Sequence, residues 1–334
     1  MAIQVGINGF GRIGRSVFRI ISDREDIEVV AINDLFDNEQ LAYLLKYDTV
    51  MGILHKEVKI EGDAMYVAGQ KVVMTAHRHP AEIPWKDMGV YVVIESTGVF
   101  RNRASIEKHF DGGTEKVILT VPSKDEIDAT IVIGVNDEEL KPEHRIVSNA
   151  SCTTNCLAPI AKILDDEFGI EEGFITTVHA YTNDQRLADV PHKDFRRSRA
   201  AGENIIPTTT GAARAVGKVL PQLQGKLDGL AMRVPVPDGS IVDLACRLGE
   251  KASRKDINAA VQEAAKGPMQ RVVEYSEAPL VSSDIIGNTH SSIFDALSTN
   301  SQEDGYARIV SWYDNEWGYS NRVVDLIGML AAIS

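Results

Sequence analysis

Residues 151–156 place a cysteine thiol where a helix is expected to begin. Residues 145–149 are typical of a strand end, and from Leu157 to Phe168 apolar residues recur at helical spacing. Cys152 is therefore expected in the first turn of that helix, beside unpaired backbone N–H groups and the positive end of the helix dipole. Such a position lowers the pKa of a cysteine and makes its thiol a nucleophile.

A second group must take the proton from that thiol, and His179 is the candidate because it ends a β-branched run that starts at Thr176. A cysteine with a base nearby is the general arrangement for covalent catalysis. Taken alone, the cysteine leaves open the alternative of a buried structural thiol. Cys246 lies in an apolar segment and is expected in the core. No spacing of cysteines and histidines resembles a zinc site, so no metal is expected.

A glycine-rich turn near the N-terminus points to a dinucleotide. Gly9, Gly11 and Gly14 form a G-x-G-x-x-G motif between an expected strand and an expected helix. Such glycines allow a tight turn, close approach of a pyrophosphate and close packing of helix on strand. Asp34 follows the second strand, where a carboxylate accepts from the ribose hydroxyls of NAD and repels the extra phosphate of NADP. The alternative is a structural turn together with an acid at the N-terminus of a helix, and the order of strand, turn and helix favours the cofactor.

Strands and helices alternate in the first half of the chain. Apolar strands are expected at 3–8, 27–33, 90–95, 116–121, 131–135 and 145–147. Their near-continuous apolar character predicts a parallel sheet covered on both faces, which is an α/β Rossmann dinucleotide-binding domain. Thr97 and Thr120 follow strand ends, at the edge where nucleotides bind in such sheets.

The pattern changes after about residue 150. Long strands are expected at 174–178, 227–236, 240–248 and 306–313, with helices at 254–266 and 320–333. This pattern predicts an α+β domain with a mainly antiparallel sheet and helices on one face. The segment 184–211 has little regular pattern, and irregular loops of that length are usually functional.

Composition and charge narrow the class of protein. The chain has 334 residues, 44% of them hydrophobic and 25% charged, which predicts about two soluble domains. A net charge of −13 argues against nucleic acid or an anionic membrane as the main partner. Three cysteines do not form a disulfide framework. The sequence shows no signal peptide and no bilayer-spanning run, so a cytoplasmic protein is expected.

Five segments together resemble the phosphorylating, NAD-dependent glyceraldehyde-3-phosphate dehydrogenase family over the whole chain. They are residues 7–15, 148–156, 179–182, 207–213 and 312–320. The resemblance implies a homotetramer whose subunits have an NAD-binding Rossmann domain (1–150) and a catalytic domain (151–317). It also implies that the C-terminal helix (318–334) returns to the NAD-binding domain.

The resemblance also implies roles for individual residues. Cys152 is the expected nucleophile and His179 the base that activates it. The residues expected at NAD are Gly9, Gly11, Arg12, Ile13, Asp34, Arg78, Thr97, Thr120 and Asn315, with Asn315 holding the nicotinamide amide. Thr182 and Arg233 are expected to bind the phosphate of the substrate. Those expected at inorganic phosphate are Ser151, Thr153, Arg197, Thr210 and Gly211.

These roles describe the oxidation of glyceraldehyde 3-phosphate to 1,3-bisphosphoglycerate through a cysteine thioester, with inorganic phosphate as second substrate, in glycolysis and gluconeogenesis. The nearest alternative is an erythrose-4-phosphate dehydrogenase, which shares the thiol chemistry but releases a free acid. A complete inorganic-phosphate site argues against it. A thiol hydrolase is opposed by the dinucleotide motif, and an RNA-binding role by the acidic charge.

Overall fold

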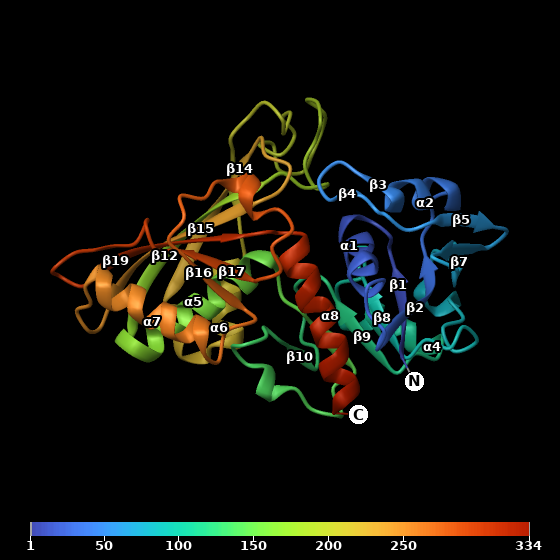
Figure 1. Ribbon diagram of the computed structural model, residues 1–334, viewed down its shortest axis with the longest axis horizontal. Helices are drawn as coiled ribbons and strands as arrows, with labels where there is room; N and C mark the ends of the chain where they lie inside the picture. Colours follow the sequence, from blue (N-terminus) through green and yellow to red (C-terminus); the bar gives the residue numbers. More distant parts are fainter. Residues whose placement is uncertain (1, 334) are drawn as a thin grey trace. The chain divides into compact units, whose positions relative to one another are not determined.

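The computed structural model describes residues 2–333, which form two compact units (Figure 1). The first unit contains residues 2–131, 138–150 and 320–333, and the second contains 132–137 and 151–319. In the described part of the chain, no helix combines the length and the apolar character needed to cross a membrane.

The first unit is built on a nine-stranded sheet. Seven strands are parallel, in the order β10-β11-β9-β8-β1-β2-β7, and β6 and β5 extend the edge as an antiparallel hairpin. The strands are β1 (Ile3–Asn8), β2 (Ile27–Asn33), β5 (Val58–Glu61), β6 (Ala64–Val67), β7 (Gln70–Thr75), β8 (Val92–Glu95), β9 (Lys116–Leu119), β10 (Ala129–Thr130) and β11 (Ile146–Ser148). A two-stranded ribbon, β3 (Tyr47–Asp48) and β4 (Gly52–Ile53), lies apart from this sheet.

Helices connect these strands, as a parallel sheet requires. The first, α1 (Arg12–Ile21), starts directly after the glycine turn, and α2 (Asn38–Lys46) begins at the cap Asp37, whose side chain accepts from two backbone N–H groups. The remaining helical segments are α3 (Arg103–Ile106), α4 (Lys108–Asp111), η1 (Pro80–Glu82) and η2 (Asp137–Glu139). The Rossmann-like domain predicted from the sequence is therefore confirmed.

The strand predicted at 131–135 is wrong, because side chains take the backbone groups that a strand would need. The Val132 N–H donates to the Asn136 side chain, and the Gly134 N–H donates to the Asp137 side chain. Gly134 also has a φ of 82°, which ends an extended run. The strand at this edge of the sheet is instead the short β10.

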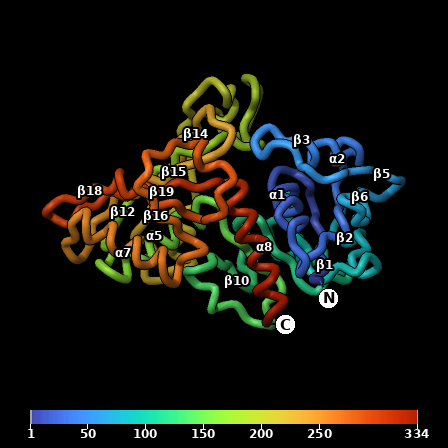
Figure 2. Tube along the Cα trace, viewed as in Figure 1, coloured from blue at the N-terminus to red at the C-terminus, as the bar shows by residue number. Residues whose placement is uncertain are grey.

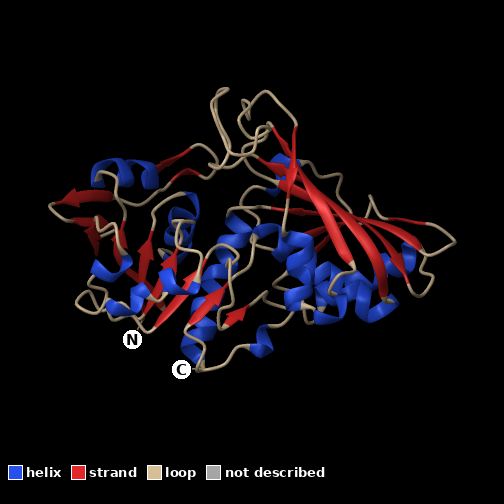
Figure 3. Cartoon of the chain, turned by 180° about the vertical axis from the view of Figure 1, so that it is seen from behind, coloured by secondary structure: helices blue, strands red, loops and turns tan. Residues whose placement is uncertain are grey.

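The second unit carries an eight-stranded mixed sheet in which most neighbours are antiparallel (Figure 3). Its path is β13-β14-β12-β15-β19-β17-β16, and β18 pairs with β19. The strands are β12 (Ile170–Ala180), β13 (Ile206–Thr209), β14 (Leu227–Val234), β15 (Ser240–Leu248), β16 (Val273–Ser276), β17 (Ser292–Asp295), β18 (Asn300–Ser301) and β19 (Tyr306–Tyr313). This confirms the predicted mainly antiparallel domain.

Helices cover one face of this second sheet. The helix α5 (Cys152–Phe168) lies against β12, β15, β17 and β19, and it is flanked by α6 (Ala212–Val219) and α7 (Arg254–Lys266). Two 3-10 helices, η3 (Pro221–Leu223) and η4 (Ser282–Ile285), complete the connections. The last helix, α8 (Trp317–Ala332), begins after β19.

The chain between β12 and β13 is the long irregular segment expected from the sequence (Figure 2). Residues 181–205 contain neither a helix nor a strand, and one isolated bridge joins Arg186 to Ala200. Only the last part of the predicted loop is regular, as β13.

Candidate active site

The N-terminus of α5 sets the position of the Cys152 thiol. Ser151 is the N-cap, and its Oγ accepts the Thr154 N–H at 3.0 Å. Ala150, one residue earlier, has a φ of 52°, a left-handed conformation that residues with a Cβ rarely adopt. Such strained residues occur where the surrounding structure holds a sharp turn at a functional position. Cys152 is thus presented in the first helical turn, as the sequence predicts.

The alternation of β12 sets the position of His179. Side chains of successive strand residues point to opposite faces, so Ile175, Thr177 and His179 share one face, and all three are buried. The α5 helix covers this face. The His179 Nε2 lies 3.5 Å from the Cys152 Sγ. The two residues that the sequence predicts as nucleophile and base are therefore brought into contact.

The far side of the His179 ring meets two polar groups. Its Nδ1 lies 2.7 Å from the Ala180 carbonyl oxygen, and Arg233 Nη1 donates to the same oxygen at 2.8 Å. The Ala180 carbonyl oxygen can only accept and favours a proton on Nδ1, whereas the Arg233 guanidinium, 2.6 Å from the same nitrogen, can only donate and favours an unprotonated Nδ1. With the proton on Nδ1, the lone pair of Nε2 is directed at the thiol, which is the arrangement of a general base.

Arg233 reaches this position because its strand pairs with the strand of the base. In the parallel pairing of β12 and β14, His179 and Arg233 are register partners, so their side chains share a face. Arg233 Nη1 lies 2.6 Å from His179 Nδ1. A positive charge is thus fixed beside the base and near the thiol.

Burial controls the resting charge of the pair. It raises the pKa of the Cys152 thiol, although Arg233 and hydrogen bonds with Thr153 act in the opposite direction. Burial, together with the Arg233 charge, lowers the pKa of His179 to about 3. The expectation that the helix N-terminus alone lowers the pKa of Cys152 is therefore wrong, because desolvation outweighs it.

The thiols of the other two cysteines are buried and are not expected to react. Cys156 lies one turn further along α5, is buried, and has its Sγ 3.6 Å from the Ser292 Oγ. Cys246 is buried within β15, as predicted. Burial raises the pKa of each thiol to about 12. Both remain protonated at neutral pH.

Tyr313 is a site residue that the sequence reasoning missed. Its hydroxyl lies 2.9 Å from the Thr153 Oγ1 and 2.8 Å from the Thr177 Oγ1, which joins α5 to β12. Its ring meets the His179 ring edge to face, with 5.8 Å between centroids. Its place beside Asn315 in the segment 312–320 is the sequence signal that could have indicated it.

Four of the residues predicted at the phosphates lie at two helix N-termini of the second unit. Ser151 and Thr153 lie at the start of α5, while Gly211 is the N-cap of α6 without a side-chain cap. The Thr210 Oγ1 accepts the Ala212 N–H at 3.2 Å, and Thr182 lies in the irregular segment after β12. Hydroxyl groups and helix N-termini are suited to bind anions.

Arg197 is held by the irregular segment itself. Its guanidinium forms ion pairs with Asp184 and Asp194, and its Nε donates to the Thr208 Oγ1 at 2.9 Å. These bonds join the segment after β12 to β13. The residue therefore has a structural task, in addition to the phosphate-binding role expected from the sequence.

In the first unit, each glycine of the turn has a distinct task. Gly9 has a φ of 92°, and a Cβ added to Gly14 would stand 2.3 Å from the Gly9 carbonyl oxygen. By contrast, a Cβ at Gly11 would meet nothing within 4 Å. The first and third glycines thus serve the turn and the packing of α1 on β1, and the second leaves the helix N-terminus open to a pyrophosphate.

The remaining candidates for the dinucleotide lie at strand ends. Asp34 follows β2, where its oxygens accept the Phe10 N–H at 2.7 Å and the Phe36 N–H at 3.1 Å. A carboxylate has further lone pairs for ribose hydroxyls. Thr97 and Thr120 follow β8 and β9, Arg78 is exposed after β7, and Ile13 lies in the first turn of α1.

Two residues predicted to contact the dinucleotide have side-chain partners within the protein. The Arg12 guanidinium forms an ion pair with Asp48. Asn315 belongs to the second unit, is buried, and accepts the Ser240 hydroxyl at 2.5 Å. This bond fixes the orientation of the Asn315 amide, with its oxygen toward Ser240.

Comparison with known proteins finds two matching regions, one within each unit. Residues 3–103 match the family described as "Glyceraldehyde 3-phosphate dehydrogenase, NAD binding domain", and residues 151–315 match "Glyceraldehyde 3-phosphate dehydrogenase, C-terminal domain". Curated relatives named glyceraldehyde-3-phosphate dehydrogenase are 54% identical in Mycolicibacterium smegmatis and 55% in Priestia megaterium. In both comparisons the match covers 99% of this chain and 99% of the relative.

The chain belongs to the glyceraldehyde-3-phosphate dehydrogenase family. A relative from Bacillus subtilis, named glyceraldehyde-3-phosphate dehydrogenase 1, is 54% identical over 332 residues. Membership confirms the resemblance found in the sequence, the oxidoreductase activity of this family in glycolysis, and NAD as the cofactor.

Proposed function

We propose that this chain oxidises D-glyceraldehyde 3-phosphate to 1,3-bisphosphoglycerate, with Cys152 as nucleophile and His179 as base. The observation that carries the proposal is the 3.5 Å distance from the Cys152 Sγ to the His179 Nε2. The thiol is presented at a helix N-terminus, and the base is oriented by the Ala180 carbonyl. NAD, when bound, would accept the hydride.

The first step is attack of sulfur on the aldehyde carbon. His179 Nε2 takes the thiol proton as the C–S bond forms, and the carbonyl oxygen becomes an alkoxide. Backbone N–H groups of the first turn of α5 and the protonated imidazole are the donors for this oxygen. Loss of hydride from the carbon then leaves a thioester on Cys152.

The second step uses inorganic phosphate. A phosphate oxygen attacks the thioester carbonyl and the C–S bond breaks. His179 Nε2 then gives back to sulfur the proton that it took in the first step. Arg233 and Thr182 hold the phosphate of the substrate. The attacking phosphate binds at Ser151, Thr153, Arg197, Thr210 and Gly211, which supply hydroxyls, a guanidinium and helix N-termini.

The cofactor is held by residues at the carboxyl ends of the first sheet. The open N-terminus of α1 at Gly11 takes the pyrophosphate, with Gly9, Arg12 and Ile13 around it. Asp34 accepts from the ribose, and Asn315 holds the nicotinamide amide. Arg78, Thr97 and Thr120 complete the set. We assign residues 1–150 and the C-terminal segment 318–334 to the cofactor domain, and 151–317 to the catalytic domain.

A homotetramer in the cytoplasm completes the proposal. The second unit exposes large apolar side chains, with Phe174 at 70% and Leu230 at 40%, on the face of the sheet opposite its helices. Leu187, Phe195 and Ile205 of the irregular segment are also exposed. Patches of this kind mark protein interfaces. Light scattering should give four chains per particle, and a monomer at micromolar concentration would contradict this assembly.

One assay tests the reaction. We expect NADH formation from glyceraldehyde 3-phosphate to require inorganic phosphate for steady turnover. Erythrose 4-phosphate should be a much poorer substrate. Equal turnover with and without phosphate, or a preference for erythrose 4-phosphate, would favour the hydrolytic alternative.

A further inference from the structure

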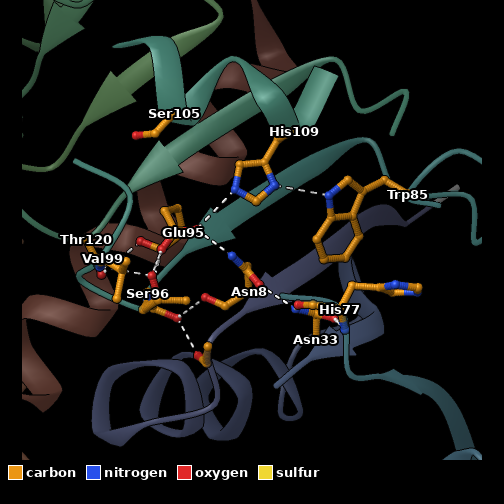
Figure 4. Close-up of polar contacts among 12 residues, drawn as sticks. Asn8, Asn33, His77, Trp85, Glu95, Ser96, Val99, Ser105, His109 and Thr120 are labelled. Carbon is orange, nitrogen blue, oxygen red and sulfur yellow. Dashed lines mark hydrogen bonds and ion pairs between the residues drawn. The ribbon is translucent and has the colours of Figure 1, made fainter. Parts of the chain in front are cut away.

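A buried chain of hydrogen bonds lies at the carboxyl ends of the first sheet (Figure 4). Its centre is Glu95, the last residue of β8, which has an exposed fraction of 0%. His109 from α4 is equally buried, and its Nε2 lies 3.1 Å from the Glu95 Oε2. Neither Glu95 nor His109 is among the residues proposed to contact the dinucleotide.

The proton on His109 is fixed by a tryptophan. The Trp85 indole N–H lies 3.1 Å from the His109 Nδ1. An indole nitrogen can only donate, so Nδ1 must be the accepting nitrogen. The imidazole is then neutral, with its proton on Nε2, and it donates to Glu95. Histidine therefore contributes a hydrogen bond to the carboxylate without contributing a positive charge.

Glu95 accepts from three further donors. The Asn8 Nδ2 donates to its Oε2 at 2.6 Å, the Thr97 N–H donates to its Oε1 at 2.9 Å, and the Thr97 hydroxyl donates to the same Oε1. A carboxylate surrounded by four donors is stabilised by hydrogen bonds in place of an ion pair. Because Glu95 only accepts, the Asn8 amide must turn its nitrogen toward it.

The orientation of the Asn8 amide in turn sets the hydrogen bonds of Asn33 and His77 at the ends of neighbouring strands. The Asn8 Oδ1 accepts from the Asn33 Nδ2 at 2.8 Å. Asn33 in turn donates to the His77 carbonyl oxygen at 2.9 Å and accepts the His77 N–H at 2.8 Å. The chain of bonds thus ties together the ends of β1, β2, β7 and β8 (Figure 4).

Each of these ends is followed directly by a residue assigned to the cofactor. Asn8 precedes Gly9, Asn33 precedes Asp34, and His77 precedes Arg78, while Thr97 itself bonds to Glu95. We propose that Glu95 is a positioning residue for NAD, which presets the four strand-end turns through one directed chain of hydrogen bonds. This inference rests on the proposed function, because it takes these turns as the NAD site.

The variant Glu95→Gln tests the direction of the chain. Glutamine keeps the size of the side chain but presents an NH2 group to donors, so at least one bond must be lost. We expect the Kd for NAD, measured by calorimetry on the full chain, to rise at least tenfold. The KM for NAD should rise with it, while kcat at saturating NAD stays within about twofold. Hydrogen exchange without cofactor should increase in the turns that follow all four strands.

A matched control is Lys116→Met. Lys116 is also buried and donates to the His144 carbonyl oxygen at 2.9 Å, but it starts β9, at the amino end of the sheet. This variant should lower thermal stability without changing the Kd for NAD. An equal loss of NAD affinity in the control would show a merely structural effect and would overturn the inference.

The wild-type titration separates this inference from the proposed function. If the wild type binds NAD and Glu95→Gln binds it equally well, the positioning role is wrong while the dehydrogenase assignment stands. If the wild type binds no NAD, both are wrong. Should Glu95→Gln fail to fold, Trp85→Phe removes the donor to His109 together with part of a buried ring, and Lys116→Met remains the control for lost stability. The Trp85→Phe variant should weaken NAD binding at least threefold, and an unchanged Kd would overturn the inference.

Discussion

Arg233 and His179 are register partners on neighbouring parallel strands, and this pairing puts the Arg233 Nη1 2.6 Å from the His179 Nδ1. The residue assigned to the substrate phosphate therefore also contacts the catalytic base. Its charge acts on both members of the catalytic pair, since it lowers the pKa of His179 and that of Cys152. Under the proposed roles, one guanidinium would couple substrate binding to proton transfer.

The substitution Arg233→Gln should shift the pH dependence of the reaction as well as weaken substrate binding. Removing the positive charge raises the pKa of His179 and of Cys152, so the rise of kcat/KM should move to higher pH. The KM for glyceraldehyde 3-phosphate should increase at least tenfold. A pH profile identical to that of the wild type would contradict the coupling, whatever happens to KM.

The carboxylate of Asp34 should decide the choice of cofactor. Two unit charges 4 Å apart repel by on the order of 4 kcal/mol at an effective dielectric constant of about 20, and screening by water reduces this value. We expect Asp34→Ser to improve NADP binding by roughly a hundredfold, or about 2.7 kcal/mol. Equal efficiency of the wild type with NAD and NADP, measured as kcat/KM, would refute the assignment.

Asp238 should make stability depend on pH. Burial raises its pKa to about 9, and the negative charges of Asp314 and Glu316 add to the shift. Its pKa when unfolded is near 3.9, so the folded state binds the extra proton and loses stability as the pH rises from about 4 through 9. Asp238→Asn should flatten this loss and raise the unfolding temperature at pH 8.5. Asp87→Asn, at an exposed position before β8 in the first unit, is the control and should follow the wild type.

Arg197 should matter more for the phosphate step than for the hydride step. In Arg197→Ala we expect steady turnover to fall at least tenfold, while the first-turnover burst of NADH stays within about twofold of the wild type. Arg199 is an exposed arginine in the same segment, and Arg199→Ala should leave both phases unchanged. Loss of the burst in Arg197→Ala would mean that the residue acts before the thioester forms.

The sequence predicts what depends on local pattern. The helix at 254–266 and the strands at 240–248 and 306–313 have the predicted bounds, because apolar spacing and local turn residues determine them. The places of Cys152 at a helix N-terminus and of His179 near a strand end also follow from local pattern, while their pairing was expected from the chemistry and from the family resemblance. The strand expected at 131–135 fails because the Asn136 and Asp137 side chains take its N–H groups.

Side-chain contacts between residues far apart in the chain could not be predicted from the sequence. Tyr313 reaches Thr153 across 160 positions, and no periodicity indicates that its hydroxyl would join α5 to β12. His109 showed no motif, yet it is buried against Glu95. The pKa of Cys152 was also mispredicted, because the helix terminus is visible in the sequence while the depth of burial is not.

The central claim is that the acyl group is carried on Cys152. The direct measurement is peptide mapping of enzyme mixed with glyceraldehyde 3-phosphate and NAD without phosphate, quenched in acid during the first turnover. We predict one NADH per active site and a phosphoglyceroyl thioester on Cys152 alone. His179→Asn should form the same adduct at least a hundredfold more slowly. An NADH burst with the acyl group on Cys156 or Cys246, or with no acyl group on any cysteine, would contradict the account.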